Sequence, residues 1–355
     1  MRRLTRYGVI VAAGMIAAGC TAGSQSSSSS GSGSSNKAAS NSSLTISNEA
    51  GQLWSCGFNP LNPTFTMLSY GFVYEPLVYV NPLQQGKPTP MLASSYKWGA
   101  GNKTLTFTIR SGVKWSDGTP MTANDVAYTF NLTKKNSALD LTGAWSVLSS
   151  VTASGDTVTM NFSKVAVPYF YYIADQVPIV PEHIFSKIAN PVTDPVKAPV
   201  GTGPYTMSKC TPQNITYKAN PNYWQPGLPK VKTIQYPAYT SNNTANDDLA
   251  NGSAQWGGQY IPGIKAFYTS KSPDFKYWFP PTVNVTLIPN LTDPQLKNLK
   301  VRQAISYAIN RTQVSNTGES GYEPPANQTG IVTPTFSSSL DQSALSAWGN
   351  GYDPA

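Results

Sequence analysis

Aromatic rings and uncharged amides are the side chains in this sequence best suited to hold a ligand. They lie in loops that follow expected strands, at Asn48, Gln52, Trp54, Trp256, Gln259 and Tyr260. Flat aromatic faces pack against apolar side chains or sugar rings, and amides supply hydrogen-bond donors and acceptors without charge. We expect these six residues to bind a small molecule. Simple burial of Trp54 and Trp256 in the core is the alternative.

Few residues are candidates for a catalytic, metal-binding or nucleotide-binding site. His183 is the only histidine, so a Ser-His-Asp or Cys-His site would have to use it, and a zinc site would lack ligands. A packing or helix-cap role for His183 is the simpler interpretation. The glycine-rich stretches contain no G-x-x-x-x-G-K-[ST] loop for ATP. We therefore expect a protein that is not an enzyme, with no catalytic residues, metal or cofactor.

Cys20 has the setting of a lipidated cysteine. Residues 1–7 carry three arginines and no acid, residues 8–19 are apolar or small, and Cys20 follows Gly19 directly. A basic start, a short apolar run and a small-residue end describe a secretory signal, and the run is too short to span a bilayer. The end of this run is similar to a bacterial lipobox. We expect cleavage before Cys20 and a lipid on its sulfur, with an ordinary signal peptide as the alternative.

The segment after Cys20 is a low-complexity linker. Residues 24–43 read SQSSSSSGSGSSNKAASNSS and offer almost no apolar surface to bury. A Ser/Gly chain of this length has a root-mean-square reach of about 25 Å. Such a tether suits a protein that meets a membrane partner repeatedly.

Cys56 and Cys210 are the remaining cysteines. Outside the cytoplasm the two thiols could pair in a disulfide, and the alternative is two separate buried cysteines. The sequence leaves both open.

Bulk composition narrows the class of protein. The 355 residues are only 12% charged and include 28 glycines and 29 prolines, which is typical of a chain rich in turns and strands. The net charge is +8, but three of the positive charges lie in the signal, and no Lys/Arg cluster with interleaved aromatics appears. We therefore expect no nucleic-acid partner. The length indicates two or three lobes.

Hydrophobic periodicity predicts a mixed α/β fold. Alternation over residues 105–110 predicts a strand with one buried face, and Thr122 to Asp125 form a capping-box pattern that begins a helix. Further strands are expected at 44–47, 96–98, within 151–165, at 230–236 and at 283–289. We expect residues 70–80 to pass from a helix into a strand, and further helices at 246–251 and 301–311, the latter with an apolar stripe.

Six segments in this order resemble the extracytoplasmic solute-binding proteins, family 5, of peptide-type ABC importers. They are YEPLV at 74–78, FTIR at 107–110 with GVKWSDGTP at 112–120, TANDV at 122–126 with TF at 129–130, GTGPY at 201–205, NPNYW at 220–224, and VRQAI at 301–305 with AI at 308–309. The residue types in these motifs suit the framework of the fold rather than ligand binding. Gly118 and Gly203 suit tight turns, and Trp115 and Trp224 are large enough to anchor a core.

The resemblance implies a two-lobed periplasmic-binding-protein-like fold of type II, cluster C, with α/β lobes of mixed sheets. It divides the chain into a signal peptide (1–19), a lipidated linker (20–43), a lobe I core (44–79 and 195–282), a subdomain inserted into lobe I (80–194) and the start of lobe II (283–355). Family members continue beyond this length, so we expect a nearly complete first lobe and a truncated second lobe.

The implied function is ligand capture for an importer. The protein would be a monomer on the outer face of the cell membrane that binds short peptides and delivers them to ABC permease subunits. Segments around Asn59, 178–184 and 256–263 are similar to the branch that binds β-linked oligosaccharides, which is the alternative ligand. A secreted hydrolase, for which the scattered acids offer no favourable pair, and a non-functional fragment are alternatives of other classes.

Overall fold

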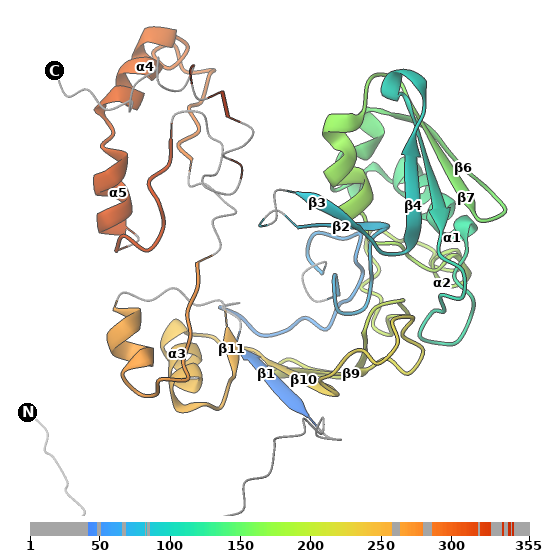
Figure 1. Ribbon diagram of the computed structural model, residues 1–355, viewed down its shortest axis with the longest axis horizontal. Helices are drawn as coiled ribbons and strands as arrows, with labels where there is room; N and C mark the ends of the chain where they lie inside the picture. The colour runs from blue at the N-terminus through green and yellow to red at the C-terminus, as the bar shows by residue number, and fades with distance from the viewer. Residues whose placement is uncertain are drawn as a thin grey trace, which may run out of the picture. The chain divides into compact units, whose positions relative to one another are not determined.

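The computed structural model describes residues 42–47, 51–65, 69–81, 83, 86–257, 263–279, 286–318, 320–327, 336, 340, 341 and 343. Mixed sheets and helices alternate along the chain (Figure 1), so the predicted α/β class is confirmed.

The fold contains a five-stranded sheet with the strand order β11-β1-β10-β9-β8. Its strands are β1 (Ser43–Ser47), β8 (Tyr205–Thr211), β9 (Asn214–Ala219), β10 (Thr233–Pro237) and β11 (Trp256–Gly257). β1 runs parallel to both of its neighbours, β10 and β11, and the other pairs are antiparallel. This sheet therefore joins the first described strand to strands about 200 residues later.

The second large sheet is four-stranded and antiparallel, with the order β4-β5-β7-β6. Its strands are β4 (Ala93–Trp98), β5 (Thr104–Ile109), β6 (Leu148–Ser154) and β7 (Thr157–Phe162), and β2 (Val78–Asn81) and β3 (Lys87–Pro90) form a separate hairpin. In β5, every second residue is buried, as the alternation predicted. α1 (Ala123–Lys135) packs against β6 and β7 with Val126 and Phe130 buried.

Two hydrophobic cores result. The first draws on residues 77–179 and surrounds Phe107, Trp115 and Phe130. The second draws on residues 46–74 and 132–236 and contains Phe58, Tyr74 and Tyr217. The exact domain boundaries remain a prediction.

The other helices are short. Among the described residues the other α-helices are α2 (Glu182–Phe185), α3 (Asn242–Asn251), α4 (Leu299–Ala308) and α5 (Arg311–Gly318), and η7 (Tyr171–Asp175) is a π-helix. α3 ends as predicted at Gly252, which has a φ of +83°. None of the helices in the described part of the chain is both long enough and apolar enough to cross a membrane.

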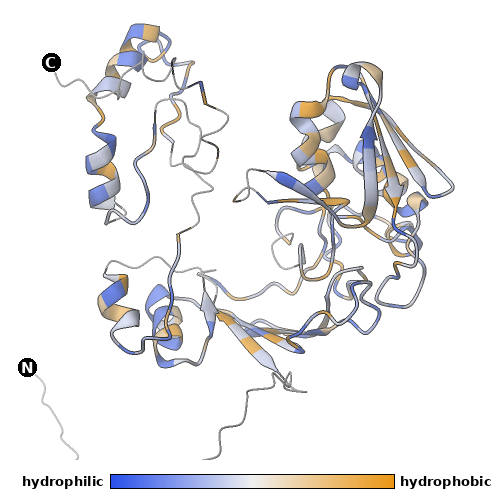
Figure 2. Ribbon diagram, viewed as in Figure 1, coloured by the Kyte–Doolittle hydropathy of each residue, from blue (hydrophilic) through white to orange (hydrophobic). Residues whose placement is uncertain are grey.

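Three predictions of elements need correction. No helix forms over residues 70–77, which are turns and extended chain before β2, because Pro76 interrupts the run and the residues from 73 to 78 are buried without a helical period. The described part of the strand predicted at 283–289 is irregular. The helix predicted at 301–311 is two helices, because Ile309 is extended with a ψ of 111°. No residue of α4 is buried, and both helices mix hydrophilic and hydrophobic residues (Figure 2).

Candidate functional site

The carboxyl ends of β1 and β11 lie at the same edge of the five-stranded sheet. The two strands are parallel neighbours, with Ile46 opposite Trp256 and Ser47 opposite Gly257. Ligands of open α/β sheets commonly bind outside the carboxyl ends of adjacent strands. The strand ends that precede the two segments in which we expected amide and aromatic ligand residues therefore lie side by side.

Trp256 presents a broad apolar surface at this edge. Its side chain is 63% exposed, although the backbone of β11 pairs with β1. Gly257 packs closely here, since a Cβ at this position would lie 2.9 Å from the Ser47 carbonyl oxygen. Trp256 is therefore an aromatic platform on a fixed backbone.

Trp54 has a different environment. It is only 7% exposed, its ring stacks on Tyr236 with centroids 5.2 Å apart, and its indole Nε1–H donates to the Tyr236 carbonyl at 2.8 Å. This placement favours the core role that we held as the alternative, because neither its face nor its N–H is available to a ligand. Gln52 is exposed. Asn48, Gln259, Tyr260 and Cys20 lie outside the described residues.

A disulfide joins Cys56 to Cys210 of β8, with their Cα atoms 5.8 Å apart. Nearby, the Trp54 amide donates to the Pro212 carbonyl at 2.9 Å. These two links hold the segment that follows β1 against the hairpin of β8 and β9. They restrict the freedom of the chain between Gln52 and Cys56.

An exposed group of tyrosines was missed by the sequence reasoning. Tyr79 of β2 and Tyr171 and Tyr172 of η7 are exposed, and the last two rings are 5.4 Å apart in an edge-to-face arrangement. Burial and the nearby Asp175 carboxylate raise the pKa of Tyr171. These rings could pack on apolar or sugar groups. The run of aromatics at 169–172 was the available signal.

His183 pairs with Asp117 rather than with a nucleophile. Its Nε2 lies 2.8 Å from the Asp117 Oδ2 at the surface of α2. Partial burial acts to raise the pKa of Asp117, but hydrogen bonds from His183 and Thr119 outweigh it, and the pKa is lowered. No cluster of histidine, cysteine or acidic side chains suited to a metal ion occurs within the described ranges.

The fold is that of the two-lobed solute-binding proteins. The chain belongs to the bacterial extracellular solute-binding proteins, family 5, whose model matches residues 87–355. This identification confirms the family predicted from the six motifs.

Two relatives illustrate the range of ligands. The chain is 30% identical over 278 residues to the glutathione-binding protein GsiB of Shigella flexneri, covering 74% of this chain and 51% of that one. A periplasmic oligopeptide-binding protein of an ABC transporter from Thermotoga maritima superimposes with a TM-score of 0.74 at 27% identity, over 89% of this chain and 61% of that one. A second structure of the Thermotoga protein, with mannohexaose bound, has a TM-score of 0.73 and 26% identity, over 89% of this chain and 60% of that one. The chain thus spans about half the length of the curated relatives it matches.

Proposed function

We propose that this chain belongs to the ligand-capturing component of an ABC importer and binds short peptides outside the cytoplasm. The observation that carries the proposal is the parallel pairing of β1 with β11, in which the exposed Trp256 lies opposite Ile46 near the carboxyl end of β1. Capture would proceed by closure of two lobes over the ligand and delivery to a membrane permease.

Short peptides are the preferred ligand class. Neutral amides at Asn48, Gln52 and Gln259 match the donors and acceptors of a peptide backbone, and Trp256 and Tyr260 suit its apolar side chains. The relatives described as glutathione- and oligopeptide-binding proteins support this choice. An oligosaccharide is the second candidate, because exposed aromatic rings also pack on sugars and one relative carries mannohexaose.

The proposal includes a tether. Lipidation of Cys20 and the Ser/Gly segment that follows it would keep the protein close to its permease. A lipid on this cysteine would be detected by mass spectrometry of the protein extracted from membranes. Recovery of the mature protein in the soluble fraction would contradict the tether.

Ligand binding is tested by thermal unfolding of the purified protein. We expect a panel of tripeptides that includes glutathione to raise the melting temperature, because a ligand at one hundred times its dissociation constant stabilises the native state by about 2.7 kcal/mol. Mannohexaose tests the second candidate. If neither ligand class changes the melting temperature, both assignments are wrong.

The Trp256→Ala variant locates the site. We expect it to weaken ligand binding by about tenfold or more, since the loss of a buried ring costs about 1.5–3 kcal/mol. Trp278, which is 67% exposed, provides the matched control as Trp278→Ala. Equal affinities for the two variants would remove Trp256 from the site.

A further inference from the structure

A pocket lies between β3, β5 and the segment that follows β9. It has a volume of about 780 Å³ and is lined by residues 89–91, Ser94, residues 108–112, Asp156, residues 224–226 and Leu228. None of these residues belongs to β1 or β11. Its volume lies in the range of small-molecule sites.

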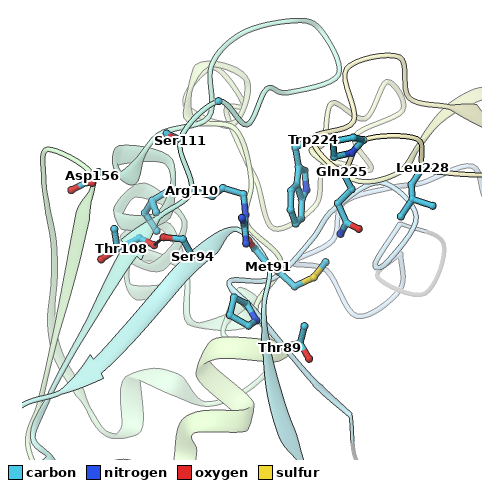
Figure 3. Close-up of a pocket in the computed structure, with 14 residues that line it drawn as sticks. Thr89, Met91, Ser94, Thr108, Arg110, Ser111, Asp156, Trp224, Gln225 and Leu228 are labelled. Atoms are coloured by element: carbon cyan, nitrogen blue, oxygen red, sulfur yellow. Dashed lines mark hydrogen bonds between the residues drawn. The ribbon is translucent and has the colours of Figure 1, made fainter.

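Arg110 places a positive charge in this pocket. Its Nε donates to the Met91 carbonyl at 2.9 Å, and its guanidinium lies 4.5 Å over the Trp224 ring (Figure 3). Among the described residues, the terminal guanidinium nitrogens have no hydrogen-bond acceptor. The guanidinium is therefore held in one position while its terminal donors remain available.

The negative charges nearby do not occupy those donors. Glu75 is buried behind Trp224, and its two oxygens accept from the Tyr223 hydroxyl and the Trp224 indole. Asp156 lies on the opposite side of Arg110 from Trp224 in the view of Figure 3, and its Oδ1 accepts from the Thr157 hydroxyl. Both carboxylates therefore have other partners.

The remaining lining is neutral and partly apolar. The Trp224 ring, Met91 and Leu228 offer apolar surface, and Gln225 and Ser111 offer uncharged polar groups. A planar guanidinium matches the two oxygens of a carboxylate, and an adjacent indole suits a flat group. The lining thus combines recognition of an anion with recognition of an apolar body.

We propose that this pocket is a second ligand site, distinct from the site at β1 and β11, which binds a small carboxylate with a flat or apolar body. The carboxylate pairs with the terminal nitrogens of Arg110, and the body of the ligand lies against Trp224, Met91 and Leu228.

Calorimetric titration of the whole chain with hippurate tests the proposal, and hippuramide is the matched neutral probe. We expect hippurate to bind at least tenfold more tightly than hippuramide. Equal affinities, or no binding of hippurate, would overturn the proposal.

Variants locate hippurate in the pocket. Gln225→Glu adds a negative charge at the rim without altering the stack of Arg110 on Trp224, and we expect it to weaken hippurate binding at least threefold. Gln213→Glu adds the same charge on the turn between β8 and β9 and should stay within twofold of wild type. No difference between these variants, or loss of hippurate binding in Trp256→Ala, would place hippurate elsewhere and reject this site.

Discussion

Glu75 shows how one buried carboxylate joins distant parts of the chain. Its Oε1 accepts from the Tyr223 hydroxyl at 3.0 Å and its Oε2 from the Trp224 indole at 2.9 Å, across 148 and 149 residues. Arg110 stacks on the same Trp224 ring. Three of the family's motifs therefore meet at one point, which supports their interpretation as scaffold.

This carboxylate predicts a pH dependence of stability. Burial raises the pKa of Glu75 to about 6, against the opposing effects of its hydrogen bonds and of Arg110. The folded state holds the Glu75 proton more tightly than the unfolded state. Protonated Glu75 therefore adds its full stabilisation of the fold below about pH 4.5, and this stabilisation is lost as the pH rises through about 6. The loss is about 2 kcal/mol.

Denaturant unfolding of wild type and Glu75→Gln between pH 4.5 and 7.5 measures this loss. Residue 75 of the variant cannot ionise. As the pH rises, the unfolding free energy of wild type should therefore fall by about 2 kcal/mol relative to that of Glu75→Gln. Glu182→Gln, at an exposed position, controls for removal of a charge. If the unfolding free energies of wild type and Glu75→Gln change in parallel with pH, Glu75 does not cause the pH dependence.

The two candidate tryptophans show what the sequence could not resolve. We expected both in loops, but Trp54 is buried by Tyr236, which lies 182 residues away, while Trp256 lies in β11 with its ring in solvent. Which of the two is covered depends on contacts between strands far apart in sequence. Neither hydrophobicity nor local spacing carries that information.

At the scale of elements, the start of α1 was predicted because its signal is local. The Thr122 amide donates to the Asp125 Oδ2 at 2.8 Å, three residues away. The other oxygen of Asp125 accepts from the Glu182 amide at 3.0 Å. This second contact joins the beginnings of α1 and α2, and its separation of 57 residues hides it from sequence patterns.

Replacing Asp125 should therefore cost more than an ordinary cap. Asp125→Ala leaves two amide donors without their acceptor, and we expect a loss of about 2–3 kcal/mol in unfolding free energy. Asn124→Ala, on the exposed face of the same turn, should change it by less than about 0.5 kcal/mol. Urea denaturation compares the two variants, and equal effects would show that the double contact contributes nothing.

At the scale of the whole molecule, the order of the motifs was sufficient to predict the family and the fold. The glycines of GTGPY explain part of this. A Cβ at Gly201 would lie 1.9 Å from the Val73 carbonyl oxygen, and one at Gly203 would lie 2.5 Å from that of Phe72. Gly203 is therefore needed for close packing between distant segments, rather than for the tight turn we predicted. Ligand identity depends on side chains around a cleft, and no motif encodes it.

The disulfide constrains most of the described fold. Cys56 and Cys210 are separated by 154 residues, so the bond closes a loop that contains the whole first core. Closing so long a loop reduces the entropy of the unfolded chain, and native disulfides typically contribute about 2–4 kcal/mol. For a chain of this size we expect the melting temperature of Cys56→Ser/Cys210→Ser to fall by about 5–10 °C. A reducing agent should lower the melting temperature of the wild type to a similar value and leave the double variant unchanged. If wild type and variant melt together under oxidising conditions, the bond does not stabilise the fold.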